Sequence, residues 1–205
     1  LASSILGKTP NYGLHLEKNR KAKVIIDVKV EIKSFSDVGA LGNYVGSIIG
    51  SKVPYFKNLE INSDKLKSLG ASMAASGSVA LYHVEGLTPE YAKAIDDDIE
   101  KIEVGKEEIE ESKCKLSSSD DMELICIGCP HCSIGEVKEA LELFKKEGRK
   151  FKGDIWICTS RYVKNELERT GVAQEIEKYA KLLADTCMVV APIEEMYEKT
   201  ATNSG

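Results

Sequence analysis

The sequence predicts an α/β fold whose C-terminal half is a doubly wound, three-stranded parallel βαβαβ unit. Residues 122–128, 154–160 and 187–192 are short apolar runs, a pattern typical of strands that are buried on both faces. The segments between them read as helices and the joins are short, so parallel strands with helical crossovers are expected. Ligands of such sheets bind at the carboxyl ends of the strands, which makes the residues after 128 and 158 candidates for a site.

Two strand–helix pairs are predicted in the N-terminal half. Residues 21–32 are rich in Val and Ile and alternate in part, which predicts a strand. Ser36 and Asp37 open a helix in which glycines recur every four residues. That spacing indicates a soluble helix packed very close to a neighbour, through Gly42, Gly46 and Gly50.

A second helix, rich in small residues, is expected at 63–78, and it leads into a strand at 79–84. Thr88 as N-cap and Pro89 at the first helical position then predict the start of another helix.

The domain boundary is expected where acidic residues are dense. Residues 96–111 predict a solvated connector with a helix, so the expected domains are 1–95 and 96–205. LASSIL before Gly7 resembles the last turns of a helix with a glycine cap, and the closing ATNSG resembles a polar loop. The chain is therefore expected to be a piece of a longer polypeptide, truncated at both ends.

Two helical segments separate the three C-terminal strands. Residues 133–148 place apolar side chains on one face, and Ser133 with Glu136 forms a capping box that fixes where this helix begins. Residues 161–184 are predicted to be helical with a break near Gly171.

Composition narrows the class of protein. A net charge of -5 without a basic stripe argues against nucleic acid as a partner. No apolar run approaches the ~20 residues that span a bilayer, and no signal-peptide pattern opens the chain, so a cytoplasmic protein without membrane contact is expected. Six cysteines in such a protein favour metal binding or catalysis over disulfides.

Three of the cysteines fall in the run CIGCPHCSIGE, residues 126–136. Cys126 alternates within a strand and is expected to be a small core residue. Cys129 ends that strand and can face a cleft. The N-terminus of the next helix favours an anion or a thiolate, which predicts a lowered pKa for the Cys129 thiol.

The spacing alone leaves several chemistries open. A zinc site and a ferredoxin-type cluster would each need a fourth ligand that does not follow. A redox pair of Cys129 and Cys132 in C-P-H-C stays open. Cys187 begins the predicted strand 187–192, which would place it at the opposite edge of the sheet from Cys129.

Five motifs, in order, resemble the aconitase X family, the large-subunit branch of the aconitase superfamily, and they span nearly the whole chain. They are KTPNYGLH (8–15), GALGNYVGSIIGSKVPYF (39–56), ASGSVALYHVEGLTPE (75–90), GCPHCSIGE (128–136) and DTCMVVAPIE (185–194). The resemblance implies an aconitase-like fold in which residues 96–205 bind the cluster.

By this resemblance, Cys129 and Cys187 are ligands of an iron–sulfur cluster, expected to be [4Fe-4S]. The third cysteine ligand is expected outside this chain. The ligand role is not carried over to Cys132, and Cys114 and Cys158 are expected to be structural.

The implied reaction is dehydration by a hydro-lyase. An open iron polarises the substrate hydroxyl while a base removes the neighbouring proton. In the superfamily that base is a serine on a separate swivel domain, here a small partner subunit, so the fragment alone is expected to be inactive. The substrate is expected to be mevalonate 5-phosphate, as in archaeal members, with cis-3-hydroxy-L-proline as the alternative. The abundance of Lys and Glu favours the archaeal substrate.

Further site residues follow from the resemblance and from position. His131 adjoins a cluster ligand and is predicted to orient the leaving hydroxyl, whereas His83 is expected to be a core histidine. Candidate substrate contacts are Thr9, Asn11, Tyr12, His15, Ser133 and Ser204.

Overall fold

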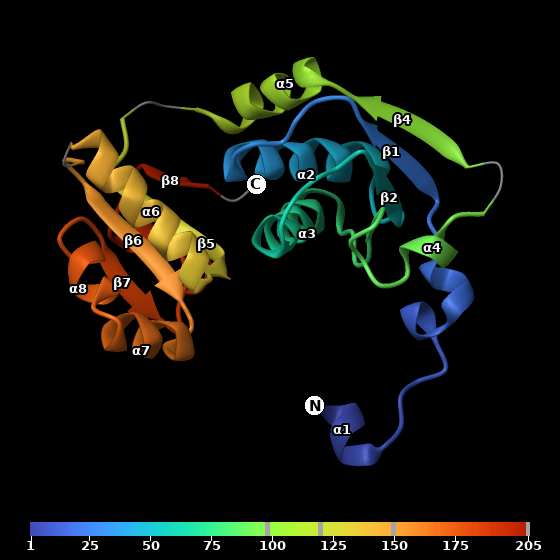
Figure 1. Cartoon of the computed structure of the whole chain (residues 1–205), viewed down its shortest axis with the longest axis horizontal. Coiled ribbons are helices and arrows are strands. Elements are labelled where there is room, and N and C mark those ends of the chain that lie inside the picture. Colours follow the sequence, from blue (N-terminus) through green and yellow to red (C-terminus); the bar gives the residue numbers. More distant parts are fainter. Residues whose placement is uncertain (97–98, 119–120, 149–150, 204–205) are drawn as a thin grey trace.

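A computed structural model describes residues 1–96, 99–118, 121–148 and 151–203, and these form two α/β units side by side (Figure 1). Each unit contains a four-stranded parallel sheet, and both sheets have the same strand order: the third, second, first and fourth strand of the unit. This is the doubly wound arrangement, because the fourth strand returns to the far side of the first. The α/β fold predicted from the sequence is therefore confirmed.

The first unit has the order β3-β2-β1-β4. Helices α2 and α3 cover one face of this sheet over a core of Val, Ile, Leu and Phe side chains, and the short α4 lies on the opposite face. The elements are β1 (Val24–Val28), α2 (Phe35–Ile49), β2 (Pro54–Lys57), α3 (Ser63–Gly77), β3 (His83–Val84), α4 (Tyr91–Ala94), β4 (Glu100–Val104) and α5 (Lys106–Leu116).

Before β1 lie α1 (Ala2–Leu6) and two short 3-10 segments, Gly13–His15 and Glu17–Arg20.

Two predictions for this unit need correction, and one strand was not predicted. The helix predicted from Ser36 begins at Phe35, because Ser34 and Asp37 form the capping box. Thr88 does not cap a helix, since its hydroxyl bonds the backbone of Val84 instead. The strand β2 has no counterpart among the predicted elements.

The acid-dense segment 96–111 contains the edge strand β4, not only a solvated connector. Val104 is fully buried and Ile102 packs against the core, while the other residues of β4, Glu100, Lys101 and Glu103, are exposed. β4 pairs with β1 along its whole length, and α5 packs on α2 through the ion pair of Lys113 with Asp37. The geometry thus places the boundary between the two units after α5, whereas the sequence predicts it at residue 95.

The second unit has the order β7-β6-β5-β8. One face of this sheet packs against α6, α7 and α8, and the other is covered by the segment 185–198. The elements are β5 (Leu124–Cys132), α6 (Ile134–Glu147), β6 (Asp154–Thr159), α7 (Arg161–Arg169), α8 (Val172–Ile176), β7 (Lys181–Ala184), a 3-10 segment (Ile193–Glu195) and β8 (Thr200–Thr202).

Helix α6 begins at its predicted capping box, and β6 lies where the sequence predicts a strand. The third strand does not lie where the sequence predicts it. It is β7, inside the segment predicted to be helical, and residues 187–192 form turns rather than a strand. The sheet also has a fourth strand, β8. Among the described residues, none of the helices has the length and apolarity that crossing a bilayer requires.

Small residues let α2 and α3 approach closely, as the glycine spacing predicts. A Cβ atom at Gly77 would lie 2.2 Å from the carbonyl oxygen of Gly46. The hydroxyl of Ser72 donates to the carbonyl oxygen of Gly39 at 2.7 Å, which satisfies a polar group inside the contact. Gly50 instead ends α2 with a positive φ of 59°.

The carboxylate of Asp27, at the end of β1, lies at the centre of an ion cluster. It is 4% exposed and contacts Lys29 and Lys101, each at 2.6 Å, while Asn58 donates to it at 2.7 Å. Lys101 first, and then Lys29, hold the pKa of this carboxyl well below its usual range. The cluster joins β1 to β4, the pair of strands at which the strand order reverses in the first sheet.

We expect Gly77→Ala to lower the free energy of unfolding by about 1–3 kcal/mol, because the added methyl meets backbone that cannot move aside. Gly70→Ala on the same helix is the matched control, since its methyl would meet only the ring of Tyr82 at 2.9 Å. Urea unfolding of both variants tests this. Equal stabilities would show that α3 can move away from α2 without penalty.

Asp27→Asn should destabilise the protein at neutral pH, and the difference from wild type should narrow in acid. The folded pKa of Asp27 is lowered, so its stabilising contribution is complete above the unfolded value of ~3.9 and is lost as pH falls toward the folded value. Urea unfolding at pH 7, 5 and 3 measures this, with Asp96→Asn as an exposed ion-pair control. A difference that does not change with pH would contradict the assignment.

Candidate functional site

Strand β5 loses register with β6 at the cysteine run. Ile127 pairs with Ile157 and Cys132 pairs with Thr159, so β5 carries three residues more than β6 over this stretch. Residues 128–131 therefore lie outside the regular ladder, as a bulge within β5 at the carboxyl edge of the sheet, which we call the cysteine turn. The peptide bond between Cys129 and Pro130 in this turn is cis.

The cysteine turn requires a glycine at its first position. Gly128 has a φ of 113°, and a Cβ atom there would lie 2.2 Å from the carbonyl oxygen of Cys158 on β6. At the other end of the turn, the buried hydroxyl of Thr159 donates to the carbonyl oxygen of Cys132 at 2.6 Å. Both ends of the turn are thus held against β6.

Four cysteines gather on the face of the sheet that segment 185–198 covers. The sulfur atoms of Cys126 and Cys158 are 3.8 Å apart and buried. Cys187 packs against the same cluster, and Cys129 lies close enough to Cys187 for that residue to raise the pKa of the Cys129 thiol. Cys187 reaches this edge because β7 ends at Ala184, which removes the conflict created by a strand at 187–192.

The pKa of the Cys129 thiol is raised, not lowered as the sequence predicts. Burial is the main cause, and the neighbouring charge of Cys187 adds to it. The N-terminus of α6 offers this thiol little, because the backbone N–H of Glu136 already donates to the Ser133 hydroxyl. The Cys129 thiol can still lose its proton to a thiophilic metal.

Cys132 lies on the opposite face of the sheet from Cys129. It is 3% exposed in the core beneath α6 and α8, and burial raises its pKa to about 12, with the nearby Glu136 as the second cause. A thiol in this position is a poor partner for a redox pair with Cys129, because it is neither ionised nor accessible.

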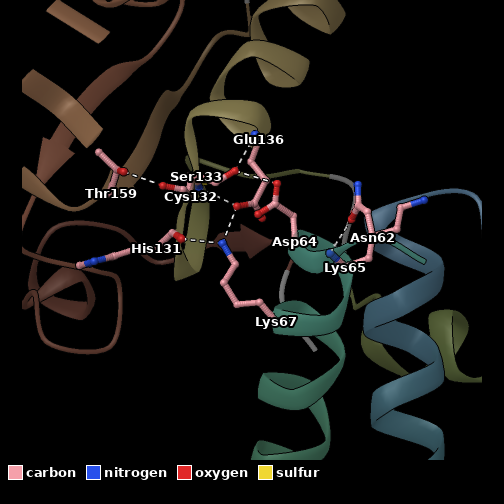
Figure 2. A network of polar contacts seen from close by, with 9 residues as sticks. All are labelled: Asn62, Asp64, Lys65, Lys67, His131, Cys132, Ser133, Glu136 and Thr159. Atoms are coloured by element: carbon pink, nitrogen blue, oxygen red, sulfur yellow. Dashed lines mark hydrogen bonds and ion pairs between the residues drawn. The ribbon is translucent and has the colours of Figure 1, made fainter. Parts of the chain in front are cut away.

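His131 links the cysteine turn to the segment that carries Cys187. Its Nε2 donates to the carbonyl oxygen of Thr186 at 2.8 Å, while its own carbonyl oxygen accepts from Lys67 at 2.8 Å. Figure 2 shows the imidazole of His131 directed away from Lys67, so this residue connects two neighbours on opposite sides. The predicted role of His131 in orienting a leaving hydroxyl stays a prediction.

The hydroxyl of Ser133 is committed to the protein. It donates to a carboxylate oxygen of Asp64 on α3 at 2.8 Å and accepts from the N–H of Glu136 at 3.1 Å (Figure 2). A substrate contact from Ser133 would have to displace Asp64, and that role also stays a prediction.

The structure does not bring the N-terminal candidates to the cysteine turn. Thr9, Asn11, Tyr12 and His15 lie in the segment before β1, which Figure 1 shows beside α4 and away from the second sheet. Arg20 anchors this segment by donating to the carbonyl oxygens of residues 14 and 15 and to Glu90. Their binding roles stay predictions, and Ser204 lies outside the described residues.

A hollow of about 170 Å³ lies between this segment and the first sheet, remote from the cysteines; Glu17, Arg20, His83 and Glu90 are among its lining residues. The predicted core position of His83 is confirmed, because this residue is 2% exposed and its Nε2 bonds the carbonyl oxygen of Arg20.

Sequence reasoning missed Asp64 and Lys67, which join α3 to the start of α6. Lys67 contacts Glu136 at 2.5 Å, and Asp64 accepts the hydroxyl bond of Ser133. Nearly 70 residues separate each pair in the chain, so no local pattern signals them. The contact between Cys126 and Cys158 was missed for the same reason, although the sequence indicates that both are structural.

Comparisons with known proteins agree with the division into two α/β units. Residues 22–113 match the family model for the aconitase X second domain, and residues 122–205 match the model for the aconitase X third domain. The crystal structure of Thermococcus kodakaraensis aconitase X in its holo-form superposes with a TM-score of 0.92 at 48% identity, covering 99% of this chain and 53% of that chain.

Curated relatives include the phosphomevalonate dehydratase large subunits of Thermococcus kodakarensis (49% identical) and Methanocaldococcus jannaschii (48% identical), each matched over 100% of this chain and 54% of the relative. The cis-3-hydroxy-L-proline dehydratase of Hypocrea jecorina is 28% identical over 98% of this chain and 37% of that protein. The chain thus spans about half the length of the large subunits it matches.

Thr159→Val should lower the free energy of unfolding by about 1–3 kcal/mol, because the carbonyl oxygen of Cys132 would remain buried without its donor. Thr170→Val is the control, since that hydroxyl is exposed at the end of α7, and its change should stay within ~0.5 kcal/mol. Thermal and urea unfolding measure both variants. A Thr159→Val protein as stable as the control would show that the turn does not depend on this bond.

Proposed function

The chain belongs to the aconitase X family, and we propose that it is the cluster-bearing part of an iron–sulfur-dependent dehydratase, a hydro-lyase that removes water from a hydroxy acid. One observation carries the proposal: the thiols of Cys129 and Cys187 meet at the carboxyl edge of the second sheet, where ligands of doubly wound sheets bind.

The residues present fit a cluster that is held partly by this chain. Cys129 and Cys187 supply two soft thiolate donors of the kind that iron–sulfur clusters require, and both are half-buried. Within the described ranges, no group of three or more His, Cys, Asp or Glu side chains could hold a metal ion. The proposal therefore requires a third cysteine from outside this chain.

The remaining residues shape the site around these two thiols. Gly128 lets the turn close against β6, and the buried Cys126–Cys158 pair forms an apolar wall behind the ligands. Such a wall limits access of water, which strengthens electrostatic interactions at a metal site. A bound cluster would add Lewis acidity toward a substrate hydroxyl. A serine on the swivel domain of a small partner subunit would act as the base.

We favour mevalonate 5-phosphate as the substrate of the complete enzyme, because the phosphomevalonate dehydratase large subunits are 49% and 48% identical to this chain. Cis-3-hydroxy-L-proline is the alternative, from a relative at 28% identity. These relatives are large subunits, which also supports a small-subunit partner.

Anaerobic reconstitution with iron and sulfide tests the proposal on the full-length large subunit assembled with its small subunit. We expect a visible absorption band and dehydration of mevalonate 5-phosphate, both lost in Cys129→Ala and in Cys187→Ala. Cys132→Ala is the matched control and should keep the band, because this thiol faces the opposite core.

A cluster that persists in both ligand variants would overturn the assignment. A reversible disulfide between Cys129 and Cys132, with no band in the wild-type complex, would instead support a redox module. Turnover of cis-3-hydroxy-L-proline in place of mevalonate 5-phosphate would correct the substrate alone.

A further inference from the structure

We infer that Lys67 is a positioning residue: from the first unit, it holds the cysteine turn in place and, through His131, the segment that carries Cys187. Nothing in the family resemblance or in the comparisons assigns Lys67 a role. The inference deepens the proposed function and rests on it only where cluster binding is concerned, because the arrangement of the two thiols can be measured without a cluster.

Lys67 lies on α3 of the first unit, and its ammonium group contacts residues of the second unit. It donates to the carbonyl oxygen of His131 at 2.8 Å and to the Glu136 carboxylate at 2.5 Å (Figure 2). The Glu136 side chain is 11% exposed and that of Lys67 is 31% exposed, so the pair is shielded from solvent to a considerable extent. Hydrogen bonds between charged groups are roughly twice as strong as neutral ones.

The same carboxylate fixes the start of α6. Oε2 of Glu136 accepts from the backbone N–H of Ser133 at 2.7 Å, while the Ser133 hydroxyl donates to Asp64 at 2.8 Å. Lys67 and Asp64, both on α3, therefore bind side chains at the start of α6, just after the cysteine turn. The turn is attached to α3 as well as to its own sheet.

His131 extends this attachment to the second ligand loop. Its carbonyl oxygen accepts from Lys67, and its Nε2 donates to the carbonyl oxygen of Thr186, the residue before Cys187. The contacts form one continuous path, from Lys67 through His131 to Thr186. This path reaches the neighbours of both Cys129 and Cys187 without touching either thiol.

Both ligand loops need such an anchor because neither is held by regular strand pairing. The residues of the cysteine turn have left the ladder between β5 and β6, and segment 185–188 follows the last paired residue of β7. Surface loops retain conformational freedom, and a metal site depends on ligands fixed within a fraction of an ångström. Without Lys67, the two thiols would sample a wider range of separations.

The test measures how tightly two neighbouring thiols bind a single arsenic atom. Phenylarsine oxide forms two As–S bonds with a pair of neighbouring thiols and releases water, so its affinity reports their mutual position. We would titrate it into the cluster-free full-length large subunit. Cys129→Ser and Cys187→Ser define the signal from this pair, because the other thiols remain in these variants.

Lys67→Met should weaken arsenical binding roughly 10-fold or more, the usual size of effect for removing a group that orients metal ligands. Lys67→Arg, which keeps a charged donor, should recover most of the affinity. Lys65→Met is the matched control on the same helix, because Lys65 donates to the carbonyl oxygen of Lys33 inside the first unit and should bind like wild type.

His131 provides a second variant pair in case Lys67→Met folds poorly. His131→Gln keeps a side-chain N–H that can reach Thr186, whereas His131→Leu removes it, so only the leucine variant should weaken arsenical binding. In the reconstituted complex, Lys67→Met and His131→Leu should also lose the cluster to a chelator several-fold faster than wild type.

Wild-type arsenical affinity in folded Lys67→Met and His131→Leu would overturn the inference, whatever the cluster experiments give. Conversely, if no cluster forms in the wild-type complex but Lys67→Met weakens arsenical binding, the positioning role stands and the proposed function fails. The two conclusions are therefore separable.

Discussion

The close contact between Gly128 and the backbone of Cys158 is the constraint on which the site depends. Because β5 approaches β6 this closely and then rejoins it at Cys132, the intervening residues must leave the sheet together. The register shift adds three residues, an odd number, so it reverses the alternation of side chains between the two faces of the sheet. Cys132 enters the core beneath α6, and Cys129 joins Cys126 and Cys187 on the opposite face. A single backbone contact thus separates a structural thiol from a candidate ligand within four residues of sequence.

The two units share a strand order but use the reversal point of their sheets in opposite ways. In the first unit, the carboxyl edge of β1 carries two lysines paired with the carboxylates of Asp27 and Glu103, so the charges balance. In the second unit, the same edge of β5 carries the cysteine turn, whose Cys129 thiol lies beside Cys187 in the uncharged run 186–193. The common topology provides a similar potential binding site at each sheet edge. Of the two, the second has the thiol ligands that suit a soft metal.

Much of the fold could be predicted from local patterns, and the errors have physical causes. The capping box of Ser133 and Glu136 and the apolar run of β6 are complete within a few residues, so they were predicted correctly. Cys187, Met188 and Ala191 pack on the face that holds Trp156, whereas Val189 and Val190 are exposed, so this apolar run does not pair as a strand. The real strand, β7, has only four residues and an exposed Lys181, which local patterning cannot distinguish from the end of a helix. The contacts of Lys67 and Asp64 with the start of α6 join distant segments, so they are visible only in the folded chain.

The joint between the two units has a consequence for how the protein assembles. Among the described residues, no hydrophobic cluster mixes the two units, and the joint consists of charged and polar side-chain ends such as those of Asp64, Lys67 and Glu136. Each core can therefore collapse on its own during synthesis, and a later docking step aligns the two halves. A bound metal centre would then require that docking is complete. In a chain whose two units are folded but wrongly docked, the thiols would not be placed to bind the same metal centre.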